Sequence, residues 1–120
     1  LDGLVGSEMC IRDSHDGVDL AADTGTAIAC FADGTVTAVG ESSSYGKYCT
    51  VTHANGCTTL YAHCGRISVS SGAAVKKGEK LGEVGETGMA TGPHLHFEIT
   101  ENGQLVNPLK YLTDYVKAWN

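Results

Sequence analysis

Short apolar runs, separated by polar turns that contain glycine, follow one another along most of this chain. The runs of strand length cover residues 26–31, 35–39, 47–53, 57–63, 67–69, 80–84 and 94–100. Runs this short, rich in β-branched and aromatic residues and bounded by turns, indicate strands rather than helices. With 16 Gly and only 2 Pro among 120 residues, the pattern predicts a mainly β fold with many tight turns.

One pair of runs has a specific hairpin signal between them. Asn55-Gly56 separates the runs 47–53 and 57–63, and this dipeptide favours a two-residue type I′ turn. Such a turn would pair Thr52 with Thr59. It would also place the cysteines of the two strands on opposite faces, so we expect no disulfide between them.

The two ends of the chain depart from this pattern. Residues 1–14 show no usable period, and we expect a poorly defined N-terminal segment, such as a truncation or assembly artefact, before a single domain at 15–120. The chain starts without Met, so we expect a missing upstream region, which could hold an anchor. Near the other end, Asn107 can cap a helix with Pro108 at its first position. Apolar residues then recur at helical spacing at Leu109, Leu112, Val116 and Trp119. They predict a short C-terminal helix packed on the core.

The candidate chemistry begins with two histidines at the start of the last long run. His94 and His96 are two residues apart, so in a strand they would project from the same face. Leu95 and Phe97 would then face a core. One isolated His-x-His motif does not establish a metal site, because histidine has many structural roles.

Three further groups elsewhere in the chain could complete a site. His15 and Asp19 lie on either side of Gly17, where a sharp turn would let them converge. His63 ends a predicted strand and would share a face with Tyr61. Three N or O ligands with an open fourth position are typical of catalytic zinc, and two remaining histidines would supply acid–base groups.

Charge and cysteine content narrow the class of protein. The formal net charge of −6 argues against nonspecific nucleic-acid binding. The sequence has no run of 18 apolar residues and so predicts no membrane span. The five cysteines are odd in number and form no Cys-x-x-Cys pair. We therefore expect free thiols rather than a disulfide framework or a structural zinc site.

The motifs around these residues resemble those of the lysostaphin-type (LytM-like) zinc endopeptidases. The matching motifs are, in order, His15-x-x-x-Asp19, Tyr61-Ala-His63, Thr87-Gly, Gly92-Pro-His-Leu-His-Phe-Glu98 and Asn107-Pro108. The resemblance implies that His15, Asp19 and His96 bind Zn²⁺, while His63 and His94 are catalytic.

The same resemblance also implies the fold and the substrate. It implies an antiparallel β-sheet or sandwich-like domain with its site in a groove, and the loops 40–46 and 86–92 would form the groove walls. Tyr45, in the first loop, would either contact the peptide or be solvated. The implied reaction is hydrolysis of bacterial peptidoglycan stem peptides or cross-bridges in the cell envelope or outside the cell. We expect a monomer.

Two other interpretations remain open from the sequence. A non-catalytic module of the same fold could bind the cell wall or activate an amidase, although the intact site residues argue against it. A phosphocarrier is the second alternative, since the glucose-specific carrier of the sugar phosphotransferase system has a related β architecture and paired histidines. Its chemistry needs no Asp ligand, so Asp19 near His15 argues against it. The sequence defines neither the bond that is cut nor which of His63 and His94 is the base.

Overall fold

A computed structural model describes residues 11–14, 17–88 and 92–106, which form ten β-strands and no helix. The strands are β1 (Ile11–Ser14), β2 (Gly17–Ala21), β3 (Ala27–Ala29), β4 (Gly34–Ser42), β5 (Gly46–His53), β6 (Cys57–Ile67), β7 (Ala74–Val75), β8 (Lys80–Val84), β9 (His94–Glu101) and β10 (Gln104–Val106). The prediction of a mainly β fold is confirmed. The predicted C-terminal helix and His15 lie outside the described residues.

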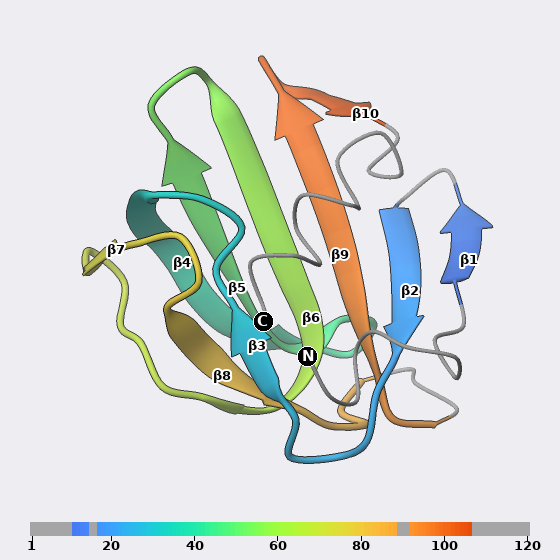
Figure 1. Cartoon of the computed structure of the whole chain (residues 1–120). Coiled ribbons are helices and arrows are strands. Elements are labelled where there is room, and N and C mark those ends of the chain that lie inside the picture. The colour runs from blue at the N-terminus through green and yellow to red at the C-terminus, as the bar shows by residue number, and fades with distance from the viewer. Residues whose placement is uncertain (1–10, 15–16, 89–91, 107–120) are drawn as a thin grey trace.

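All ten strands belong to one antiparallel sheet. The main order is β1-β2-β9-β6-β5-β4-β7, while β10 extends the β9 edge and β8 joins β6 to β3. Figure 1 shows β3 and β8 in front of the large twisted sheet, where they fold over one of its faces. Strands β3 and β8 therefore cover one face of the sheet to which they belong. In the main order, β9 lies between β2 and β6.

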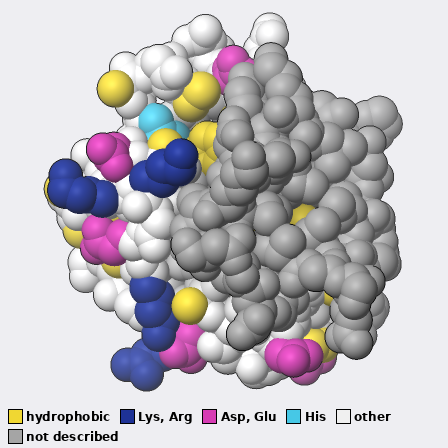
Figure 2. Space-filling view, viewed as in Figure 1, with side chains coloured by type: hydrophobic (Ala, Val, Ile, Leu, Met, Phe, Trp, Pro, Cys, Tyr) yellow, Lys and Arg dark blue, Asp and Glu magenta, His cyan; other side chains and the backbone are white. Residues whose placement is uncertain are grey.

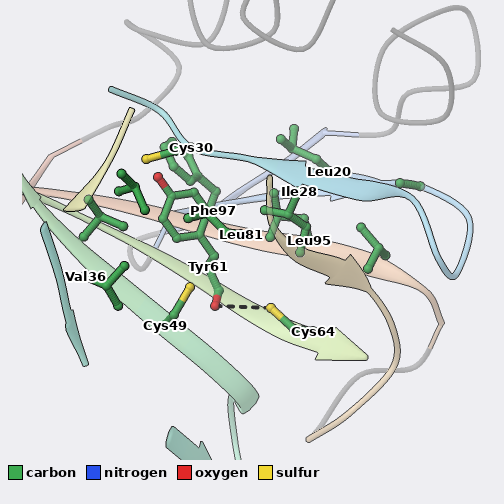
Figure 3. Close-up of a cluster of buried hydrophobic side chains, with 14 of the residues drawn as sticks. Leu20, Ile28, Cys30, Val36, Cys49, Tyr61, Cys64, Leu81, Leu95 and Phe97 are labelled. Carbon is green, nitrogen blue, oxygen red and sulfur yellow. Dashed lines mark hydrogen bonds between the residues drawn. The ribbon is translucent and has the colours of Figure 1, made fainter. Parts of the chain in front are cut away.

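The core lies between this central part of the sheet and the strands β3 and β8. On β9, the side chains of Leu95, Phe97 and Ile99 are completely buried, as the alternation of residues along a strand requires. They pack with Tyr61 of β6 and Ile28 of β3 in one apolar cluster (Figure 3). Burying side chains of this size stabilises a fold by roughly 1.5–3 kcal/mol each.

The β5–β6 hairpin differs in register from the sequence prediction. Thr52 pairs with Thr58 rather than with Thr59, so the connection is a three-residue loop at 54–56. Gly56 takes a φ of 83°, as expected for a three-residue hairpin loop that ends in a left-handed residue. Asn102 donates its backbone N–H to the Gly56 carbonyl at 3.1 Å. This contact with the β9–β10 turn helps to stabilise the three-residue loop, whose length the Asn55-Gly56 dipeptide alone did not predict.

The changed register also corrects the argument about cysteines. Cys49 pairs with Tyr61, and Cys57 lies four residues from that partner, so the two cysteines share a strand face but are far apart along it. Within the described residues, the four cysteines Cys30, Cys49, Cys57 and Cys64 are all free. The expectation of free thiols is confirmed for these four, for a different reason than the one predicted.

The predicted surface loop at 40–46 is mostly strand. β4 continues to Ser42 and β5 begins at Gly46, which leaves a tight turn at 43–45. A Cβ added at Gly46 would lie only 2.3 Å from the carbonyl carbon of Thr87. The turn is therefore in close contact with the segment that precedes β9.

Among the Asp, Glu, Lys and Arg side chains whose burial the structure describes, only Glu98 is buried. Figure 2 shows basic and acidic side chains interspersed on the visible part of one face, without a single dominant patch. No helix in the described part of the chain is long and apolar enough to cross a membrane.

Candidate active site

Asp19, His94 and His96 come together where β2 pairs with β9. Asp19 lies directly opposite His96 in the register of these strands. Its Oδ1 atom is 2.7 Å from His96 Nδ1 and 3.7 Å from His94 Nε2. The prediction that the two histidines project together, with the neighbouring apolar residues in the core, is confirmed.

The ring of His63 also lies at this site, although the alternation along β6 would point it to the other face. Its ring centroid is 4.8 Å from that of His94 and 6.0 Å from that of His96. Tyr61 is fully buried in the core, so the prediction that Tyr61 and His63 share a face is wrong. The reason is a left-handed backbone at His63, with a φ of 62°, which interrupts the alternation of β6 and turns the ring to the other side.

Hydrogen bonds from two neighbouring segments hold the backbone of His63 in this conformation. The His63 N–H donates to the Tyr45 carbonyl at 2.8 Å, and the His63 carbonyl accepts from the Gly85 N–H at 3.1 Å. A non-glycine residue in a sparsely populated backbone region costs on the order of 1–3 kcal/mol and persists when its surroundings impose it. Such strained residues are frequent at functional sites.

The side chain of His63 is oriented by Thr87. Nδ1 of His63 lies 2.7 Å from the Thr87 carbonyl oxygen. A carbonyl can only accept, so Nδ1 has the proton and Nε2 is left with a free lone pair. Thr87 is itself anchored, because its hydroxyl donates to the Cys64 carbonyl at 2.6 Å and accepts from the Lys47 N–H at 3.0 Å. Burial lowers the pKa of His63 below its ordinary value, although the bond to Thr87 opposes this.

His96 has a carboxylate at each of its ring nitrogens. Besides the contact with Asp19, its Nε2 atom lies 2.9 Å from Oε2 of Glu98. Burial lowers the pKa of His96, but the hydrogen bonds to Glu98 and Asp19 outweigh this effect, so the pKa is raised overall. Glu98 was not among the predicted site residues. Its signal in the sequence was the period of two that it continues after His94 and His96.

Tyr45 also has a role that the sequence did not show. Its hydroxyl donates to Glu98 Oε2 at 2.8 Å, and its ring is stacked near His96 with centroids 6.0 Å apart. It is therefore a partner of the site residues rather than a solvated loop residue. His53, by contrast, lies on the core side, with its ring nitrogens 2.8 Å from the Asp33 carbonyl oxygen and 3.0 Å from Thr59 Oγ1.

The donor atoms present suit zinc chemically, but the described residues hold only two of the three predicted ligands. Among residues 11–14, 17–88 and 92–106, no three His, Cys, Asp or Glu side chains form a metal-binding group. Asp19 and His96 nevertheless bring a carboxylate oxygen and an imidazole nitrogen together, which are donors that Zn²⁺ accepts. The assignment of His15, Asp19 and His96 as ligands therefore stays a prediction.

Comparison with known proteins identifies the family. The profile of peptidase family M23 matches residues 13–108. The chain belongs to this family. The M23 domain is 48% identical over 95 residues to the DD-carboxypeptidase/endopeptidase Mpg of Neisseria meningitidis serogroup B, a match that covers 79% of this chain and 22% of Mpg. It is 38% identical over 96 residues to the peptidoglycan DD-endopeptidase ShyA of Vibrio cholerae, covering 80% and 22% of the two chains.

Solved structures show the same fold. A mutant of the catalytic domain of the prophage-encoded M23 protein EnpA from Enterococcus faecalis is similar with a TM-score of 0.78 at 35% identity, over 89% of this chain and 94% of that one. A zinc-containing peptidase from Vibrio cholerae has a TM-score of 0.77 at 31% identity, over 87% and 37% of the chains. The M23 domain spans about a fifth of the length of Mpg and ShyA, 22% in each case.

Proposed function

We propose that this M23 domain is a zinc-dependent endopeptidase that hydrolyses peptide bonds in bacterial peptidoglycan, in the cell envelope or outside the cell. The main support is the convergence of Asp19 with His63, His94 and His96 from three different strands. The names of the relatives Mpg and ShyA support the substrate. The zinc-containing peptidase of the same fold supports the metal.

In this proposal His15, Asp19 and His96 hold the metal. Bound Zn²⁺ would polarise the scissile carbonyl and lower the pKa of a water molecule to about 7. The protein supplies the remaining requirements, which are the orientation of these ligands and two imidazoles beside them. Asp19 has a side chain that is 25% exposed, so substrate can approach from its side.

His63 is the better candidate for the general base. Its Nδ1 proton is committed to the Thr87 carbonyl, and the free Nε2 lone pair can take a proton from the attacking water. Burial lowers its pKa, so the ring is neutral, as a base must be, in neutral solution. This choice goes beyond the sequence, which left the roles of His63 and His94 open.

His94 then takes the complementary role. Its Nδ1 atom lies 2.9 Å from the Gly92 carbonyl and must donate to it, which leaves Nε2 turned toward Asp19 at 3.7 Å. From this position beside the proposed ligand Asp19, the His94 ring can stabilise the developing negative charge and deliver a proton to the leaving amine.

The test is digestion of purified peptidoglycan and defined muropeptides from several wall types, with mass analysis of the products. We expect cleavage of peptide bonds that is lost on chelation and restored by Zn²⁺. Full zinc content with no cleavage of any wall type would instead favour the non-catalytic wall-binding module.

A further inference from the structure

Glu98 is a buried carboxylate whose hydrogen bonds both belong to the active site. The residue is only 7% exposed, and its Oε2 atom accepts from the Tyr45 hydroxyl and contacts His96 Nε2. A buried carboxylate is costly unless it is paired or hydrogen-bonded. In the described part of the chain its ion-pair partner is His96 rather than a Lys or Arg. The carboxylate of Glu98 is therefore placed to accept a hydrogen bond from the imidazole of His96.

We propose that Glu98, held in place by the Tyr45 hydroxyl, is a positioning residue that keeps the proton of His96 on Nε2 and so presents Nδ1 as the metal-binding atom. The metal part of this inference rests on the proposed zinc function. Histidine ligands of metals usually donate their other N–H to a carboxylate or carbonyl, which fixes the tautomer and the ring orientation.

The exposure of the two carboxylates indicates which one faces the reaction. The side chain of Asp19 is 25% exposed, whereas that of Glu98 is 9% exposed. A catalytic metal needs an open position for substrate, and only the Nδ1 side of His96 offers one. His94 also lies on this side, with its Nε2 atom 3.7 Å from Asp19 Oδ1. Nε2 instead contacts the buried carboxylate of Glu98, which also accepts from the Tyr45 hydroxyl.

The ring of Tyr45 supports the same arrangement. It is nearly parallel to the His96 ring, at an interplanar angle of 25°, so it restricts rotation of the imidazole from the side. The hydroxyl and the ring thus act on His96 through separate contacts. Tyr45→Phe would remove the hydrogen bond to Glu98 and keep the stacking.

The experiment measures zinc affinity by competition with a chromophoric chelator in wild type, Glu98→Ala, Glu98→Gln and Tyr45→Phe. Loss of a carboxylate behind a metal-bound histidine typically weakens metal binding about 10–100-fold. We expect this loss for Glu98→Ala and a smaller one for Tyr45→Phe. Glu98→Gln should recover much of the affinity, because its amide oxygen can still accept from Nε2. Glu101→Gln, near the end of the same strand, is the matched control.

Nitrogen NMR of the zinc-loaded protein gives an independent result. The His96 resonances should show a proton on Nε2 and metal on Nδ1 in wild type, and a mixture or a loss of this pattern in Glu98→Ala. Unchanged affinity and an unchanged pattern in Glu98→Ala would overturn the inference, and so would metal on Nε2 in wild type. If wild type binds no zinc, the proposed function fails together with the inference. If wild type binds zinc and Glu98→Ala behaves like wild type, only the inference fails.

Discussion

The carbonyl oxygen of Thr87 lies 2.7 Å from Nδ1 of His63 and thereby determines which nitrogen of this ring is free. The accepting oxygen belongs to the main chain, but the position of this main chain depends on the side chain of the same residue. The Thr87 hydroxyl links the segment to Lys47 of β5 and Cys64 of β6. The orientation of the proposed base is thus set by tertiary contacts.

We expect His63→Asn to retain zinc and peptidoglycan binding and to lose most turnover. Asn tolerates the left-handed conformation that His63 adopts, so the backbone should be preserved while the base is removed. A positioned acid–base group contributes ~10²–10⁴-fold in rate. Single-turnover cleavage of muropeptides, together with metal analysis of the same sample, checks this. Wild-type rates in a zinc-loaded variant would show that His63 is not the base.

His96→Ala should lower zinc content sharply without loss of the β fold. The variant removes an imidazole that contacts Asp19 and Glu98, and the core residues on either side of it remain. Metal analysis and circular dichroism of the purified variant are the measurements. His94→Ala is the matched comparison, since it removes the neighbouring histidine on the same face and should keep more metal. Stoichiometric zinc in His96→Ala would rule out this residue as a ligand.

Gly46→Ala should destabilise the fold more than Gly72→Ala. Both residues have positive φ, 66° and 94°, and a Cβ in a left-handed conformation costs about 1–2 kcal/mol. At Gly72 nothing lies within 4 Å of the added Cβ, whereas at Gly46 it meets the backbone of Thr87 and Gly88. Overpacking typically adds about 1–3 kcal/mol. Urea unfolding of both variants measures the difference, and equal losses would mean that the contact with residues 87–88 relaxes freely.

The buried thiols should resist alkylation in the native state. Burial raises the pKa of Cys49 and of Cys64 to about 12, so below that pH both are protonated, and only the thiolate reacts. Cys57 is partly exposed, whereas Cys30, Cys49 and Cys64 are buried, so Cys57 should react before these three. Timed labelling with iodoacetamide at pH 8, followed by peptide mapping, tests this order. We also expect mild reductant to leave activity unchanged. Rapid labelling of Cys49 in folded protein would contradict the prediction.

The sequence predicted those features that depend on local periodicity. The alternation in 94–100 correctly placed two histidines on one face and Leu95 and Phe97 in the core. It failed at His63, because a single left-handed residue reverses the alternation and its cause lies in contacts from Tyr45 and Gly85. The predicted two-residue loop between β5 and β6 was also wrong. The three-residue loop at 54–56 accepts a hydrogen bond from Asn102 in the β9–β10 turn. In both places the structure depends on contacts with residues distant in the sequence, which local periodicity does not contain.

Tyr45 connects two parts of the site that are usually considered separately. Its hydroxyl acts through Glu98 on His96, and its carbonyl accepts from the N–H of His63. Displacement of the 43–45 turn would therefore disturb the proposed ligand and the proposed base together. For protein engineering, the turn and the segment at 86–88 are one transferable unit. A chimera that takes either piece from a relative without the other loses the close fit between Gly46 and Thr87, and with it the alignment of both histidines.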